Sequence, residues 1–177
     1  AHHDILIVAT SKENNYRLAV QIGSLLTENY NLISLEDYKL PLYTSNEENI
    51  DNEIVQNLIK KFYKAKGIIF CVPEYNYNIP PILSNAITWI SVEAENFRDA
   101  FDEKIILLAT HSGGSASSLL SILRNQFSHL GAYVHPRTIK VHRNLPFDPK
   151  KAKMVLKSFQ LILKLSLIHI SEPTRRY

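Results

Sequence analysis

The chain has 177 residues, of which 45% are hydrophobic and 21% charged, with a formal net charge of +3. This is the size of one domain and the composition of an ordinary soluble globular protein. The lone cysteine, Cys71, excludes a disulfide framework and a multi-cysteine metal site and suits a cytoplasmic location, and no apolar stretch approaches the roughly 20 residues of a membrane span.

Apolar runs typical of strands alternate along the whole chain with stretches of helical periodicity. The expected strands are residues 4–10, 31–37, 67–72, 103–110 and 132–141. The expected helices are residues 14–29, 50–64, 115–130 and 150–165, with a further helix starting at Pro80–Pro81. Strands separated by helices pair in parallel through right-handed crossovers, with helices on both faces of the sheet. We therefore predict an α/β, doubly wound, five-stranded parallel sheet of order 2-1-3-4-5.

One domain is expected over residues 4–165, because no linker or internal repeat interrupts the pattern. Residues 166–177 resemble translated cloning sequence, and we expect them to be a non-native tail. The last third of the chain is strongly basic, but its lysines fit the solvated face of an amphipathic helix. Aromatic residues are not interleaved with them as a base-stacking surface would require, so no nucleic-acid partner is expected.

Ligands of open parallel sheets bind beyond the carboxyl ends of the strands where the winding reverses, here between the first and third strands. The loop after the first strand, "TSKENN", places Thr10, Ser11, Lys12 and Asn15 at the amino end of a helix. Unpaired N–H groups and the helix dipole favour an anion there. Ser, Thr and Asn are also the usual helix caps, so a phosphate site and a simple cap are both open.

The loop after the third strand is unusually rich in aromatic and amide side chains. It contains Pro73, Glu74, Tyr75, Asn76 and Tyr77. Aromatic rings beside amides suit a flat heterocycle that needs stacking and hydrogen bonds at its edge. The alternative is a strand-to-helix connection with aromatic residues at a subunit contact.

The loop after the fourth strand, "HSGG", runs from His111 through Ser112 to Gly113 and Gly114, in a chain with only 5 glycines. Paired glycines permit positive φ and a close approach of the backbone to a ligand. A turn capped by Ser115 is the alternative. An anion end, a flat-ring platform and a glycine wall in one crevice together predict flavin mononucleotide (FMN).

The stretch "PEYNYNIPPILSNAITWIS" resembles the motif P-E-Y-N-x-S-x-P-G-x-L-K-N-A-I-D-W of the NAD(P)H-dependent FMN reductases, which have a flavodoxin-like fold and include quinone, chromate and azo-dye reductases. The resemblance implies that Pro73 to Tyr77 border the isoalloxazine, that Ser112 to Gly114 contact its pyrimidine side, and that the first loop holds the phosphate. It also implies hydride transfer from NAD(P)H and two-electron reduction of a small acceptor such as a quinone, free flavin, azo dye or metal oxyanion. No side chain need act as acid or base, and a homodimer or homotetramer is expected.

Two alternatives remain open. A serine hydrolase would use Ser112 as nucleophile with a histidine among His129, His135 and His142, but Thr110 stands where a nucleophile elbow needs glycine. A non-enzymatic, flavodoxin-like electron carrier would bind FMN without oxidising NAD(P)H. Such carriers tend to be strongly acidic, whereas this chain is net positive.

Overall fold

The computed structural model describes residues 5–46 and 52–171, and this part of the chain forms a single parallel sheet of order β2-β1-β3-β4-β5. The strands are β1 (Ile5–Ala9), β2 (Tyr30–Ser34), β3 (Gly67–Cys71), β4 (Ile105–His111) and β5 (Tyr133–Val141). The helices are α1 (Asn14–Leu25), α2 (Asn52–Lys64), α3 (Pro81–Glu93), α4 (Ser117–His129) and α5 (Pro149–Ser171). The predicted fold class and strand order are confirmed.

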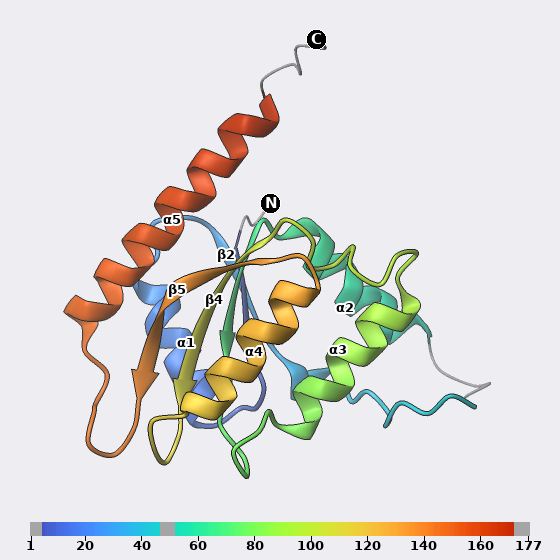
Figure 1. The fold of residues 1–177 in the computed structure, drawn as a ribbon, viewed down its shortest axis with the longest axis horizontal. Helices are drawn as coiled ribbons and strands as arrows, with labels where there is room; N and C mark the ends of the chain where they lie inside the picture. The colour runs from blue at the N-terminus through green and yellow to red at the C-terminus, as the bar shows by residue number, and fades with distance from the viewer. Residues whose placement is uncertain (1–4, 47–51, 172–177) are drawn as a thin grey trace.

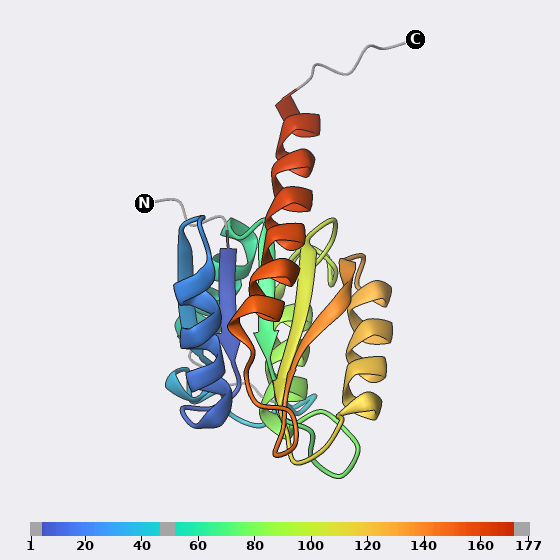
Figure 2. The same ribbon diagram turned by 90° about the vertical axis from the view of Figure 1, so that its left-hand side faces the viewer.

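Helices cover both faces of the sheet (Figures 1 and 2). Side chains of β1 alternate between two cores: Ile5 and Ile7 pack with α1 and α5, whereas Leu6 and Val8 pack with α2, α3 and α4. Strands β1 and β3 are therefore buried on both faces, which explains their unbroken apolar sequences. Burial also raises the pKa of the Cys71 thiol, so this side chain is a neutral member of the core.

The second strand is shorter than predicted. Residues Leu35–Asp37 form a 3-10 turn, η1, in place of the last three strand residues. The Ser34 hydroxyl accepts a hydrogen bond from the Glu36 N–H at 3.3 Å and so caps this turn. A serine that precedes an acidic pair by two residues, as Ser34 precedes Glu36 and Asp37, favours such a cap over continued pairing.

An irregularity marks the pairing of β4 with β5. Ile106 pairs with Val134 and Leu108 pairs with Thr138, so β5 has three residues where β4 has one. Pro136 lies in this bulge and cannot donate a ladder hydrogen bond. The Arg124 guanidinium of α4 donates hydrogen bonds to two backbone carbonyls of the bulge, that of His135 at 2.8 Å and that of Pro136 at 3.0 Å.

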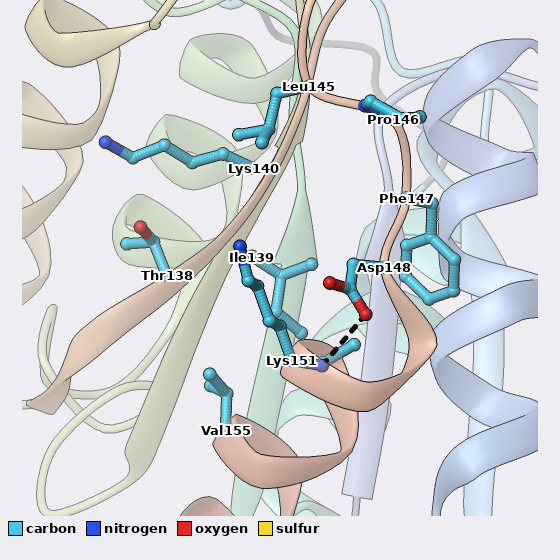
Figure 3. A pocket seen from close by; sticks show the side chains of 10 residues that line it. Thr138, Ile139, Lys140, Leu145, Pro146, Phe147, Asp148, Lys151 and Val155 are labelled. Carbon is cyan, nitrogen blue, oxygen red and sulfur yellow. Dashed lines mark hydrogen bonds between the residues drawn. The ribbon is translucent and has the colours of Figure 1, made fainter.

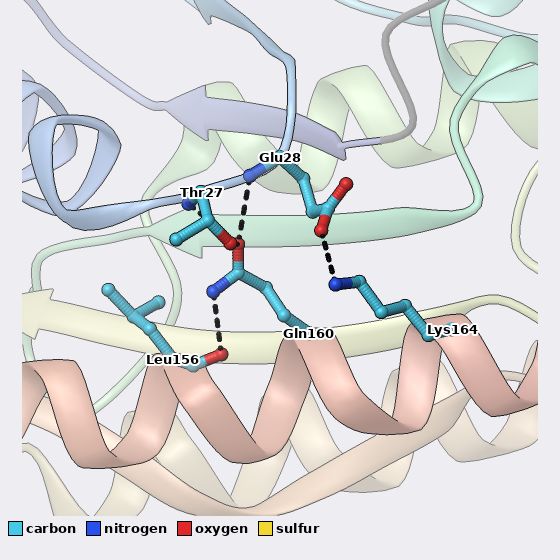
Figure 4. A network of polar contacts seen from close by, with 5 residues as sticks. All are labelled: Thr27, Glu28, Leu156, Gln160 and Lys164. Atoms are coloured by element: carbon cyan, nitrogen blue, oxygen red, sulfur yellow. Dashed lines mark hydrogen bonds and ion pairs between the residues drawn. The ribbon is translucent and has the colours of Figure 1, made fainter.

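Helix α5 runs further than the predicted 150–165 and projects beyond the rest of the molecule (Figure 1). Its Gln160 Oε1 accepts from the Thr27 N–H, the Thr27 hydroxyl and the Glu28 N–H, at 2.9 to 3.1 Å (Figure 4). Of the expected tail, 166–171 continue the helix, and 172–177 lie outside the described residues. In the described part of the chain, no helix has both the length and the apolar character that a membrane crossing requires.

Candidate functional site

Three loops meet at the carboxyl edge of the sheet, at the lower side of Figure 1. Backbone hydrogen bonds join Thr10 N–H to the Cys71 carbonyl at 3.3 Å and Val72 N–H to the Ala109 carbonyl at 3.0 Å. The next contact along the edge is from the Glu74 N–H to the Ser112 hydroxyl, at 2.9 Å. The loops that follow β1, β3 and β4 are thus neighbours, as the strand order predicts.

Glu74 and Ser112 hold two of these loops together. The Ser112 hydroxyl, which accepts from Glu74 N–H, lies 2.7 Å from the Thr110 hydroxyl. The Glu74 carboxylate reaches across to α4 and accepts from the Leu119 N–H at 3.0 Å. Because the N-cap residue of α4, Ala116, has no capping side chain, Glu74 serves as the cap and places negative charge at the positive end of the helix dipole.

The alternative cap, Ser115, is wrong, because its hydroxyl bonds to the hydroxyl of Ser117 at 2.9 Å and α4 has no side-chain cap from its own N-cap residue. The serine hydrolase alternative also lacks the hydrogen bond from a histidine to Ser112 that it would require among the described residues. Ser112 is held by Glu74 and Thr110, whereas the His135 Nε2 lies 3.0 Å from the Ser158 hydroxyl on α5. No described histidine is hydrogen-bonded to Ser112, as a general base would be.

The aromatic loop is a tight two-residue turn at the edge of the sheet. The backbones of Tyr75 and Asn78 exchange both of their hydrogen bonds, at 3.0 and 2.9 Å. Asn76 and Tyr77, between them, have φ of 50° and 59°, which makes this a type I′ turn. The side chains of Tyr75 and Tyr77 are 53% and 79% exposed, while Pro73, which precedes the turn, is buried.

A tyrosine in the left-handed region is strained, because its Cβ crowds the following carbonyl. Such strain persists where the surrounding structure fixes the backbone, and it concentrates at ligand sites. The turn therefore presents two aromatic rings and one amide side chain at a fixed place on the rim. Its sequence signal was the crowding of aromatics and amides, although the positive φ at Tyr77 was not foreseen.

Gly113 and Gly114 are exposed and leave open space at the wall of the site. A Cβ built on either glycine would have no neighbour within 4 Å. The expected use of glycine for positive φ is wrong here, because neither residue has positive φ and the left-handed residue of this loop is Ala116, at 53°. What the paired glycines provide is room for a ligand to approach the backbone.

The first loop differs most from expectation. The Lys12 ammonium forms an ion pair with Asp37, and this bond raises the pKa of Lys12. The Lys12 N–H donates to the Glu36 carboxylate at 3.0 Å. Asn15 is buried, and its amide group exchanges hydrogen bonds with the backbone N–H and carbonyl of His111 at 2.9 and 3.0 Å. Both residues thus have protein partners and fix the loop.

The remaining polar groups of the first loop fit a phosphate. The Thr10 hydroxyl is buried and has no hydrogen-bond partner among the described residues. Ser11 is half-buried beside it, and α1 begins without a side-chain cap from its N-cap residue, Glu13. An uncapped amino end leaves N–H donors for an anion. With the open glycine wall and the aromatic turn, these residues fit FMN.

Asn85 and Trp89 on α3 hold a neighbouring segment in place, a role that the sequence did not indicate. The Pro41 carbonyl accepts from the Trp89 indole at 2.7 Å and from the Asn85 amide at 2.8 Å. The Asn85 amide oxygen accepts from Tyr43 N–H at 2.8 Å, and the Tyr43 and Trp89 rings pack edge-on, 4.9 Å apart. They fasten the segment that follows η1 onto the helix that leaves the aromatic turn. Trp89 is itself buried in the core.

The fold and this edge of the sheet define a flavodoxin-like protein. The structure resembles the flavoenzyme NAD(P)H:(acceptor) oxidoreductase FerB from Paracoccus denitrificans, with a TM-score of 0.72 and 20% identity over 92% of this chain and 96% of that one. It also resembles an archaeal flavodoxin, with a TM-score of 0.65 and 13% identity over 90% and 98% of the two chains. At these identities the likeness concerns the fold.

Residues 4–144 match the family model of the NADPH-dependent FMN reductases, and the chain belongs to this family. It is therefore an NAD(P)H-dependent oxidoreductase that uses FMN as cofactor and NAD(P)H as co-substrate. An uncharacterized Mycoplasma pneumoniae protein is 29% identical over 155 residues, which are 82% of this chain and 91% of the relative.

An NADPH azoreductase from Bacillus is 27% identical over 104 residues, and an Escherichia coli quinone reductase is 35% identical over 54 residues. These matches cover 59% and 29% of this chain, and 55% and 29% of the relatives.

Proposed function

We propose that this protein passes two electrons from NAD(P)H to a small, flat acceptor such as a quinone, an azo dye or a free flavin, with a metal oxyanion as a further candidate. The observation that carries the proposal is the exposed aromatic turn beside an open glycine wall. The rings of Tyr75 and Tyr77 are exposed and available to stack on a flat substrate, and a Cβ at Gly113 or Gly114 would meet nothing within 4 Å. The quinone reductase and azoreductase names of relatives agree with an acceptor of this shape.

Bound FMN supplies the chemistry, since it accepts hydride from the nicotinamide and passes two electrons to the acceptor. The chain's own residues bind and orient. The amino end of α1, with Thr10 and Ser11, would hold the phosphate, and the aromatic turn and the glycine wall would border the ring. Glu74 and Ser112 fix these two borders relative to each other through their shared hydrogen bond.

Flavin binding is tested first, by titrating FMN into flavin-free protein and following the quenching of flavin fluorescence. We expect one site per chain and weaker binding of riboflavin, because riboflavin lacks the phosphate that α1 would hold. The loaded protein should then oxidise NADPH or NADH when a quinone is added. Protein that binds FMN but oxidises neither nucleotide would be an electron carrier, and the proposed reaction would be wrong.

We further propose a homodimer or homotetramer in which the aromatic turn lies near a subunit boundary. The exposed tyrosine rings support this arrangement, because large exposed aromatic side chains mark interaction surfaces. Sedimentation velocity over a range of concentrations distinguishes the two assemblies from a monomer. A monomer at every concentration would contradict the proposal. The cytoplasmic location stays a prediction from the sequence.

A further inference from the structure

Helix α5 presents an exposed face that carries lysines and aliphatic side chains in two adjacent rows. The first row consists of lysines, namely Lys150, Lys153, Lys157 and Lys164. In the second row, Met154, Leu161 and Leu165 are 63%, 57% and 55% exposed. At 3.6 residues per turn, these two rows together occupy about 120° of the helix surface, on the side opposite the residues that pack on the sheet. We call the two rows the α5 face.

The positive charge of the α5 face is largely unpaired. Lys164 pairs with Glu28 at 2.9 Å. The ammonium groups of Lys150, Lys153 and Lys157 form no ion pair with any residue that the structure describes. The α5 face also borders a groove of about 740 Å³, shared with the carboxyl end of α1, whose lining contains no carboxylate. A ligand that matches this surface must therefore carry negative charge.

The spacing of the lysines favours an extended array of negative charges over one small anion. Lys150 and Lys164 are 14 positions apart, which corresponds to about 21 Å along the helix axis. A single phosphate or carboxylate cannot contact ammonium groups over that length. The apolar row beside them requires a second kind of contact, because exposed aliphatic side chains gain free energy only when they are removed from water.

An anionic membrane surface offers both kinds of contact. Its head groups form an extended negative layer, and the acyl boundary below them accepts the apolar side of a helix that lies in the interface. The flexible stems of lysines let the ammonium groups reach the head groups while the methylenes stay with the apolar side chains. The two rows of the α5 face match this layered chemistry.

Other extended anions match the α5 face less well. A nucleic acid supplies charge but leaves Met154, Leu161 and Leu165 without an apolar partner. Protein interfaces are depleted in lysine and enriched in aromatic residues and arginine, and the α5 face contains neither an aromatic residue nor an arginine. A membrane is therefore the partner that the composition of this face favours.

The helix is already fixed in the conformation that docking requires. The Asp148 carboxylate caps its amino end by accepting from the N–H of Lys150 at 3.0 Å and from the N–H of Lys151 at 3.2 Å, and Figure 3 shows the second of these bonds. Phe159 and Leu163 are buried in the core on the opposite side of the helix. Docking thus needs no folding of the helix, and only exposed side chains lose freedom.

We propose that the α5 face docks this protein on an anionic membrane surface, with the helix lying in the interface and not crossing it. Helix α5 runs along one face of the sheet, whereas the three loops of the proposed flavin site lie at the carboxyl edge (Figure 2). Docking and electron transfer therefore use different surfaces, and the inference does not depend on the identity of the acceptor.

Co-sedimentation of the full chain with lipid vesicles tests the proposal. The protein should pellet with vesicles of phosphatidylcholine and phosphatidylserine, stay in solution with vesicles of phosphatidylcholine alone, and be released in about 1 M salt, where charges are screened within roughly 3 Å. The double variant Lys153→Gln/Lys157→Gln should bind the anionic vesicles about tenfold or more weakly, because each lysine near such a surface strengthens binding.

The double variant Lys60→Gln/Lys64→Gln is the matched control. It removes the same charge from α2, which covers the other face of the sheet, and should bind the anionic vesicles like the parent. Equal losses in the two double variants would show that net charge alone governs binding and would overturn the proposal. Unchanged binding in Lys153→Gln/Lys157→Gln would place the contact on another surface and would also overturn it.

The apolar row is tested separately, with Met154→Ser/Leu161→Ser. Both side chains are exposed, so the fold should be retained, while binding to the anionic vesicles should fall at least about fivefold. Unchanged vesicle binding would contradict insertion of the helix. If the parent self-associates without lipid in sedimentation velocity and this variant does not, the face binds a second copy and the proposal is wrong. NADPH oxidation with a soluble quinone should be the same in parent and variants, so a failure of docking is distinguishable from a failure of the proposed function.

Discussion

At the scale of single residues, the site is made by a few side chains whose positions depend on backbone conformation. Tyr77 has a left-handed φ that glycine would adopt without cost, while Gly113 and Gly114 have φ values that any residue could adopt. The glycines therefore leave room for a ligand, and the tyrosine supplies an aromatic ring at a position where glycine would be less strained. In both cases the residue suits ligand binding better than local stability.

Gly113→Val should remove FMN affinity without unfolding the protein. The new side chain would enter open space and face no φ penalty, so the free energy of unfolding should change by less than about 0.5 kcal/mol, as at an ordinary surface site. Flavin titration and thermal unfolding measure the two effects.

Gly131→Ala is the contrasting control. Gly131 has φ of 90°, and a Cβ there would collide with the Asp102 carboxylate, so this change should destabilise the fold by more than about 1 kcal/mol. A Gly113→Val protein that binds FMN like the parent would show that this loop does not border the flavin.

Tyr77→Gly should stabilise the protein and impair its reaction. Glycine relieves the strain of φ 59°, which is worth about 1 kcal/mol after the entropy that glycine loses on folding. The same change removes an exposed ring from the acceptor side, so kcat/KM for a quinone should fall more than FMN affinity does. Chemical denaturation and quinone kinetics measure the two effects. Loss of both stability and FMN binding would mean that the ring supports the fold.

At the scale of elements, hydrogen bonds between side chains and backbone join the helices to the sheet edge. Glu74 caps α4 from another loop, Asn15 fastens α1 to β4, and Asn85 holds the segment after η1 on α3. Each bond satisfies a backbone N–H that would otherwise lack a partner, at the end of an element or in a connecting segment. Positioning of the loops is thus distributed over several elements.

His135 links β5 to α5 and makes stability depend on pH. Its Nδ1 accepts from the Arg137 N–H at 3.1 Å, and its Nε2 lies 3.0 Å from the Ser158 hydroxyl, so the neutral ring fits both partners. Burial lowers the pKa of His135 below its usual 6.5; a backbone hydrogen bond at Arg137 acts in the opposite direction, and the charges of Arg137 and Arg124 lower the pKa further. As pH falls through this range, the unfolded chain takes up a proton that the folded protein resists, and the free energy of unfolding decreases.

We expect the loss below pH 6.5 to be at most about 1.4 kcal/mol per pH unit for this one proton, and to be absent in His135→Gln. Urea unfolding at several pH values down to roughly pH 5 measures it. His129→Gln changes an exposed histidine and should retain the parent's slope. If His135→Gln retains that slope as well, other groups carry the acid dependence.

Much of this architecture could be predicted from the sequence because its signals are local or periodic. Apolar runs such as "GIIFC" gave the strands, and Pro81 gave the start of α3. The partners of Lys12 and Asn15 could not be predicted, because they come from residues 24 to 96 positions away that only the tertiary fold brings near.

At the scale of the whole molecule, the loops after β1, β3 and β4 are neighbours at one edge of the sheet, and we expect the two substrates to share access to this edge. If NAD(P)H and the acceptor occupy the same space in turn, the oxidised nucleotide must leave before a quinone binds. Double-reciprocal plots at several quinone concentrations should then be parallel, and the quinone should compete with NADPH at high concentration. Intersecting lines would show that both substrates are bound together, and the shared-crevice mechanism would be wrong.

The single amide of Gln160 also sets a practical limit on how the chain can be shortened or fused. One oxygen satisfies three donors on the connection between α1 and β2, and the neighbouring Lys164 pairs with Glu28 at 2.9 Å. A cut after Ser166 keeps all of these bonds, whereas a cut before Gln160 leaves three donors unpaired and removes Leu163 from the core between α5 and the sheet. A fusion partner or an affinity tag can therefore be attached just past Ser166, at the end of α5 that points away from the three loops (Figure 1).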